Sequence, residues 1–197
     1  MKHLGIFIEP DIEMSEFIRE SKAYLKKINP NFEYINHPPH MTLVHGHYVE
    51  ISKIKLKLTG VLKETKNFKI KCSKLKMFEN DTFTGLDTIY LEVSNEEKLL
   101  KLQDVIVKKL KPDVFYIDKK LNLTEEIKNN LNELNYPFVY PNWIPHFSIA
   151  SVDSKTANLY FDYFSEKIYF ESNVNSVSLW EINNEEHTKL EEFLLTS

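Results

Sequence analysis

The segments Pro39-His40-Met41-Thr42-Leu43 and Pro145-His146-Phe147-Ser148-Ile149 follow one pattern: proline, histidine, an apolar residue, a hydroxyl residue and a second apolar residue. Side chains alternate between the two faces of a strand, so each histidine shares a face with its hydroxyl residue while the apolar residues face the other way. The chain has only seven histidines, and two copies of such a pattern are more than its composition predicts. We therefore expect two related strands whose polar faces meet.

Helix-like and strand-like stretches alternate around these two segments. The hydrophobic pattern predicts strands at residues 2–8, 40–44, 68–78, 88–93 and 145–152, a closing hairpin of 175–182 and 188–195, and helices at 11–28, 50–62, 95–110, 124–134 and 154–164. Each half of the chain then holds one histidine strand with helices and further strands. Two related lobes that face each other across a cleft would bring both histidine segments to its floor.

Composition excludes several classes of protein. The four glycines form no phosphate-binding loop, which excludes P-loop and Rossmann nucleotide chemistry. A net charge of −4 is not typical of a protein that binds long nucleic acid tightly and without specificity. Cys72 is the only cysteine, so an internal disulfide is impossible, and its alternating surroundings predict a packed, inert thiol. With no secretory signal and no apolar segment of membrane-spanning length, we expect a cytoplasmic monomer without membrane contact.

The paired segments supply the groups that displacement at phosphorus needs. This reaction requires a base where the nucleophile enters and an acid where the leaving oxygen departs, and an imidazole titrates near neutral pH. His40 and His146 are therefore our candidate catalytic residues. The hydroxyls of Thr42 and Ser148 would bind the nonbridging phosphate oxygens, where charge must be stabilised. Because this set performs acid–base chemistry without a metal, we expect no cofactor.

The two His-x-Thr/Ser-x segments resemble the motifs of the two-histidine (2H) phosphoesterase superfamily, which includes the bacterial RNA 2′,3′-cyclic phosphodiesterases, also called 2′-5′ RNA ligases. Agreement in chain length, motif separation and element order covers essentially the whole chain. The resemblance implies an α+β fold in which two pseudo-symmetric lobes with mainly antiparallel sheets surround a central cleft and helices lie outside. It also implies that residues 1–197 form a single bilobal domain.

The resemblance further implies an activity: a metal-independent phosphodiesterase acting on 2′,3′-cyclic phosphate or 2′-5′-linked ends of a nucleotide or short RNA. His40 and His146 carry over as catalytic residues, and Thr42 and Ser148 as phosphate binders. In related cyclic phosphodiesterases the second histidine is usually the base for water and the first the acid. Many bacterial relatives have an arginine shortly after the second motif, where this chain has Ala150-Ser151. This difference favours a nucleotide or short oligonucleotide over long RNA.

Several alternatives remain open from the sequence. The substrate could be another cyclic phosphate, such as an ADP-ribose derivative, or the fold could serve a nucleotide- or RNA-binding module without turnover. His37, His45 and His47 crowd the first segment, and a metal-dependent hydrolase could be built on them. Against this, strand alternation predicts that His45 and His47 face away from His40.

Two further features allow either a functional or a structural interpretation. Residues 53–76 contain nine lysines against one glutamate, which could form a basic wall that attracts phosphate or the solvated face of a helix and a strand. Trp143, Tyr140 and Tyr48 flank the two segments, and Phe7 lies on the first predicted strand. Each of these rings could stack on a nucleobase or pack in the core.

Overall fold

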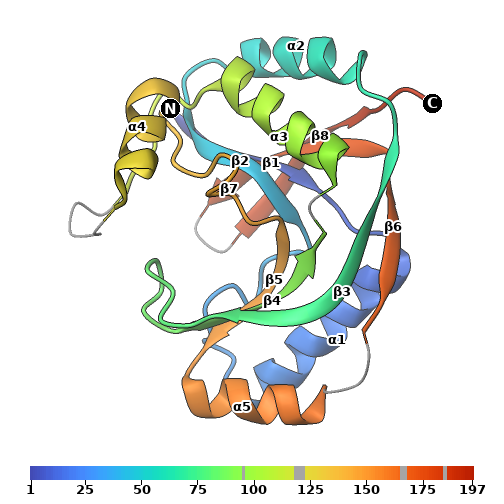
Figure 1. The fold of residues 1–197 in the computed structure, drawn as a ribbon, viewed down its shortest axis with the longest axis vertical. Coiled ribbons are helices and arrows are strands. Elements are labelled where there is room, and N and C mark those ends of the chain that lie inside the picture. The colour runs from blue at the N-terminus through green and yellow to red at the C-terminus, as the bar shows by residue number, and fades with distance from the viewer. Residues whose placement is uncertain (95, 118–122, 165–167, 184–185) are drawn as a thin grey trace.

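Two four-stranded antiparallel sheets form the centre of this computed structural model, and helices lie outside them (Figure 1). The structure describes residues 1–94, 96–117, 123–164, 168–183 and 186–197. The first sheet has the order β2-β1-β7-β8, with β1 Lys2–Ile8, β2 Met41–Tyr48, β7 Ser176–Asn183 and β8 Glu186–Leu194. The second sheet has the order β5-β4-β3-β6, with β3 Phe68–Phe78, β4 Asp87–Val93, β5 His146–Val152 and β6 Phe170–Val174. The helices are α1 Ile12–Ile28, α2 Ile51–Leu62, α3 Glu97–Leu110, α4 Glu125–Leu134 and α5 Ser154–Tyr163.

This architecture confirms the predicted α+β fold of two lobes. The pattern did not predict β6, in which one of the two buried positions is the polar residue Ser172, so the apolar alternation of a strand is hidden. The strand predicted at 40–44 extends to Tyr48. Residue 95, predicted to begin the third helix, and residues 184–185, predicted in the turn of the closing hairpin, lie outside the described residues.

The lobes do not correspond to the two halves of the chain. The reason is that β1 pairs with the C-terminal strand β7 as well as with β2, and the first sheet therefore needs both ends of the chain. Two of the helices also pack on the sheet to which their preceding strand does not belong. α1 follows β1 but packs on β5 and β6 of the second sheet, whereas α3 follows β4 but packs on β2 of the first.

Local capping explains where the helices begin. The Asp11 carboxylate accepts a hydrogen bond of 3.1 Å from the Met14 amide at the start of α1, and Thr124 caps α4 through the Ile127 amide at 3.3 Å. α4 has no buried residue among those described, so it lies at the periphery of the fold. No helix in the described part of the chain is long and apolar enough to span a membrane.

One large apolar core joins the two sheets. It includes Leu4 and Ile6 of the first sheet together with Ile70 and Leu91 of the second, all fully buried. Cys72 lies in the same core, and its thiol contacts the Met14 sulfur at 3.9 Å. Cys72 is fully buried, which confirms the prediction of a packed cysteine, and burial raises the pKa of its thiol to about 12.

Candidate active site

The first histidine segment leads into β2, the edge strand of the first sheet. His40 directly precedes this strand, and Thr42 lies on it opposite Phe7 of β1. The next partner pair is Val44 with Ile6, so one residue of β2, Leu43, is skipped in a β-bulge. Leu43 and Val44 are consequently both buried, and the strict alternation of the strand is broken there.

The second segment repeats this arrangement on β5, the edge strand of the second sheet. His146 is the first residue of β5, and Ser148 lies opposite Tyr90 of β4. The register then shifts so that Ile149 is skipped, and Ile149 and Ala150 are both buried. In each segment, therefore, the bulge directly follows the hydroxyl residue. β2 and β5 also lie against each other, which places the two segments at the junction of the sheets.

A cavity of about 860 Å³, which we call the cleft, is lined by residues of both segments. His40, Thr42, His146 and Ser148 all line it. The structure thus brings the four residues selected from the sequence to one cavity. Its other walls are largely aromatic, and no lysine or arginine of the described chain is among the lining residues.

The two imidazoles are held by matching hydrogen bonds. His40 Nδ1 lies 2.7 Å from the Pro38 carbonyl oxygen, and His146 Nδ1 lies 2.7 Å from the Ile144 carbonyl oxygen. A carbonyl oxygen can only accept, so Nδ1 donates in both rings. This fixes the tautomer and leaves Nε2 of each neutral ring as the atom that can accept or deliver a proton.

Burial lowers the pKa of both imidazoles, but their surroundings differ. The pKa of His40 lies well below its usual value because burial disfavours the cation; the Pro38 carbonyl opposes this, and the charges of His187, His37 and Lys22 add to it. Burial also lowers the pKa of His146, against which the Ile144 carbonyl and Asp81 favour the cation. The proton is therefore less unfavourable on His146 than on His40.

An aromatic ring from the neighbouring strand contacts each imidazole. Phe7 stacks on His40 with ring centroids 4.0 Å apart. Tyr90, which pairs with Ser148 as Phe7 pairs with Thr42, meets the His146 ring at 5.1 Å. Of the two interpretations left open for Phe7, the structure supports packing against a candidate catalytic residue at the wall of the cleft.

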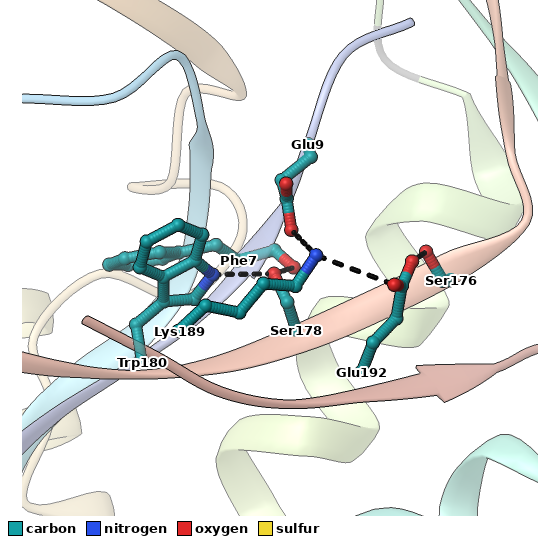
Figure 2. A network of polar contacts seen from close by, with 7 residues as sticks. All are labelled: Phe7, Glu9, Ser176, Ser178, Trp180, Lys189 and Glu192. Atoms are coloured by element: carbon teal, nitrogen blue, oxygen red, sulfur yellow. Dashed lines mark hydrogen bonds and ion pairs between the residues drawn. The ribbon is translucent and has the colours of Figure 1, made fainter. Parts of the chain in front are cut away.

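A network of polar contacts connects β1 near Phe7 to side chains of β7 and β8 (Figure 2). Trp180 Nε1 donates to Ser178 Oγ at 2.7 Å, and this hydroxyl donates to the Phe7 carbonyl at 3.4 Å. Lys189 lies over the Trp180 ring, 6.0 Å from its centroid, and pairs with Glu9 at 2.7 Å. The strand that carries Phe7 is thereby tied to β7 and β8.

The prediction that His45 and His47 face away from the cleft-facing residues was wrong. After the bulge at Leu43, His45 pairs with Gly5 and His47 with His3, on the same face as Thr42. His45 and His3 line the cleft, and their rings are joined by a 3.1 Å contact between His3 Nε2 and His45 Nδ1. Burial lowers the pKa of His45 to about 3, so this ring is neutral at physiological pH.

Sequence reasoning considered His37 only for the alternative metal site and assigned no role to His187. Their ring centroids lie 4.3 Å apart, and those of His187 and His40 lie 5.5 Å apart. Both residues line the cleft. His37 lies three residues before His40, but no pattern links His187 to the first motif, because the pairing of β7 with β8 brings the end of the chain to this place. In the described residues, no group of three or more His, Cys, Asp or Glu side chains is arranged to hold a metal ion.

The remaining aromatic and lysine candidates lie in the core or at the surface of the molecule. Trp143 lines the cleft but is buried, and its Nε1 donates to the Thr42 carbonyl at 3.1 Å. Tyr48 is buried in the core and Tyr140 is exposed, and neither lines the cleft. None of the nine lysines at 53–76 lines it either, and several are paired with glutamates at the surface: Lys53–Glu50, Lys55–Glu191, Lys69–Glu171 and Lys76–Glu92. These lysines form solvated faces and not a wall of the cleft.

Comparison with known proteins agrees with this architecture. Residues 10–186 match the family model described as the 2′-5′ RNA ligase superfamily. The crystal structure of TT0787 from Thermus thermophilus is similar with a TM-score of 0.63 at 15% identity, covering 98% of this chain and 97% of that one. E. coli LigT complexed with 3′-AMP has a TM-score of 0.59 at 12% identity (100% and 99% covered), and LigT complexed with NADP+ a TM-score of 0.56 at 14% identity (100% and 98%). No curated protein sequence matches the chain.

Proposed function

The chain belongs to the 2′-5′ RNA ligase superfamily, a group of 2H phosphoesterases, and from this premise we propose that it is a metal-independent phosphodiesterase. Its substrates are nucleotides or short RNA ends that carry a 2′,3′-cyclic phosphate or a 2′-5′ linkage. One observation carries the proposal. Two imidazoles with matching Nδ1–carbonyl hydrogen bonds border one cavity, and each lies two residues before a hydroxyl residue that lines the same cavity.

The reaction follows from this pair of groups. One imidazole accepts a proton from water through Nε2 while the water oxygen forms a bond to phosphorus. The bond from phosphorus to one ribose oxygen breaks, and the second imidazole, which starts protonated, gives its Nε2 proton to that oxygen. The hydroxyls of Thr42 and Ser148 donate to the nonbridging oxygens, where negative charge increases in the transition state. A positioned acid or base contributes about 10²–10⁴-fold to the rate.

The surroundings of the imidazoles favour His40 as the base and His146 as the acid for cyclic phosphate opening. The base must be neutral, and burial together with the charges of His187, His37 and Lys22 opposes protonation of His40. The acid must carry a proton, which Asp81 favours on His146. This is the reverse of the division that the family resemblance implied.

The charge of the cleft favours short substrates. Glu79 and Asp81 line it, and no lysine or arginine does so among the described residues. A long polyanion gains affinity from cationic side chains along its backbone, and this cleft offers none of them. Ligands of nucleotide size also agree with the LigT structures, which are complexes with 3′-AMP and with NADP+.

The test is a substrate panel assayed in the presence of EDTA. It contains 2′,3′-cyclic nucleotides, 2′-5′ oligoadenylate and an ADP-ribose cyclic phosphate. We expect EDTA-insensitive turnover, and His40→Ala and His146→Ala should each lower kcat by about 10²–10⁴-fold while the protein stays folded. Robust activity in either variant would remove that residue from the mechanism.

The panel also separates the alternatives. Turnover of the ADP-ribose cyclic phosphate alone would reassign the substrate class. Binding of nucleotides with no turnover of any member would make the protein a binding module, and loss of activity on chelation would contradict metal independence.

A further inference from the structure

The carbonyl of the bulged residue in each motif strand is bound by a buried side chain from a helix. Gln103 of α3 donates from Nε2 to the Leu43 carbonyl at 3.2 Å. Lys22 of α1 donates from Nζ to the Ile149 carbonyl at 2.6 Å. The two bulges occupy the same position in the repeated motif. Each bulge carbonyl accepts its hydrogen bond from a buried side chain of a helix.

Each of these side chains makes a second hydrogen bond, and the second bonds cross over. Lys22, bound to the bulge of the second motif, also donates to the Tyr34 carbonyl at 2.6 Å, in the segment that leads to His40. Gln103, bound to the bulge of the first motif, also donates to the Phe138 carbonyl at 2.8 Å, in the segment that leads to His146. Each side chain thus connects the strand of one motif to the approach of the other.

Both residues stand where an apolar side chain would be expected. Lys22 lies between Ile18 and Leu25 on the buried face of α1, and Gln103 is fully buried on the buried face of α3. Burying a polar group is unfavourable unless its hydrogen bonds are made. The amide oxygen of Gln103 makes none among the described atoms, so this glutamine is held at the site by its two N–H donors.

The two side chains offer equivalent donors. Burial lowers the pKa of Lys22 to about 7, and a neutral amine has two N–H groups, the same number as the amide of glutamine. In each case two N–H donors meet two carbonyl acceptors. The hydrogen bonds therefore persist when the lysine loses its charge.

We propose that Lys22 and Gln103 are paired positioning residues that hold the two motifs in register across the cleft. This role rests on the proposed function, because what it aligns is the two imidazoles and the two hydroxyls. Lys22 fixes the approach to His40 against the strand of Ser148, and Gln103 fixes the approach to His146 against the strand of Thr42. A misplacement of about 1 Å can lower the rate of a reaction about 10²-fold. Side chains that hold the four groups in register therefore affect the rate directly.

The test uses Lys22→Met and Gln103→Met, which keep an unbranched side chain and remove the donors. Each should lower kcat on a 2′,3′-cyclic nucleotide by about 10–100-fold, with KM changed much less, at a temperature where the variant is fully folded. Lys26→Met is the matched control: Lys26 also ties α1 to the approach segment, through Asn36 at 2.8 Å, but at the exposed surface and without reaching β5. It should keep wild-type kcat.

A second measurement does not depend on turnover. The Nδ1 protons of His40 and His146 are hydrogen-bonded to carbonyls and give NMR signals in the folded protein. Lys22→Met should perturb the His40 signal and Gln103→Met the His146 signal, and Lys26→Met neither. This arm tests the positioning role even if the wild-type protein hydrolyses nothing in the substrate panel, an outcome that would count against the proposed function alone.

The inference is overturned if both variants keep full kcat and unperturbed imidazole signals. It is also overturned if activity falls only in proportion to the fraction of folded protein, because that result describes a purely structural role. Should Lys22→Met fail to fold, Gln103→Met carries the same test on the pseudo-symmetric side.

Discussion

At His40 and His146, burial works against the protonated state that one of the two must adopt. Both pKa values lie below the usual value of 6.5, with burial the largest cause in each case. The Pro38 and Ile144 carbonyls partly oppose this effect, because each accepts a hydrogen bond that the cation strengthens. Catalysis through this pair therefore depends on the form in which one imidazole is neutral and the other is an imidazolium. The free protein populates this form at acidic pH.

The pH dependence of kcat/KM follows from these shifts. The productive form has one neutral and one protonated imidazole, and this form is most populated between the two pKa values. Because both are lowered, we expect a bell-shaped profile of kcat/KM with its maximum below pH 6.5. A bound phosphate stabilises the imidazolium, so the profile of kcat should lie at higher pH. A single-limbed profile, or a maximum of kcat/KM above about pH 7, would contradict the acid–base pair.

An activated leaving group tests which imidazole is the acid. An aryl oxide such as 4-nitrophenolate departs without protonation, so loss of the general acid matters little for an aryl phosphodiester. We expect His146→Ala to retain much more of its activity on bis(4-nitrophenyl) phosphate than on a 2′,3′-cyclic nucleotide, whereas His40→Ala should lose activity on both. The opposite result would restore the division of roles that the family resemblance implied.

Among the elements, the motif strands show what a sequence pattern can and cannot predict. The pattern predicted both strands and the shared face of His40 and Thr42, because alternation holds over short distances. It failed at Leu43, where the bulge turns His45 and His47 to the face of the cleft. Nothing in the sequence marks a bulge between two apolar residues, since Leu43 and Val44 fit a strand and a bulge equally well.

The helical pattern of the sequence contains a signal for Lys22 and Gln103, the two proposed positioning residues. Lys22 follows Ile18 by four positions and precedes Leu25 by three, and Gln103 stands in the same relation to Leu99 and Ile106. Both therefore interrupt an apolar helical face with a polar side chain. That interruption is readable from sequence, but the carbonyls to which they donate belong to bulges and loops that only the fold defines.

The end of β2 depends on a glycine that has no room for a side chain. A Cβ at Gly46 would lie 2.6 Å from Pro112 Cβ and 2.9 Å from Pro112 Cγ, beside the backbone that pairs with His47. We expect Gly46→Ala to lower the free energy of unfolding by about 1–3 kcal/mol, as overpacking does. Urea denaturation measures the change.

The chain supplies its own control for this substitution. Gly60 lies on α2, and a Cβ added there meets no atom within 4 Å. Gly60→Ala should therefore stabilise the protein by about 0.5–1 kcal/mol, because alanine favours the helix more than glycine does. Equal effects at the two positions would show that steric contact with Pro112 is not what constrains Gly46.

For the whole molecule, the exchange of helices between lobes makes one unit of two sheets. α1 joins the first strand of one sheet to the surface of the other, and α3 crosses in the opposite direction. The apolar core also contains side chains of both sheets. Neither lobe can keep its helices and its core when the other unfolds, which supports our proposal that residues 1–197 form a single domain.

We therefore expect one cooperative unfolding transition, with a ratio of calorimetric to van't Hoff enthalpy of about 1. Destabilising either lobe should move this transition without dividing it. Gly46→Ala acts in the first sheet, and Val152→Ala removes buried apolar volume from β5 of the second. Both variants should lower the midpoint of the same single peak in scanning calorimetry. A second peak in either variant, or a ratio clearly above about 1, would mean that the lobes unfold separately, and the alignment of the two histidine segments would then depend on contacts at the cleft alone.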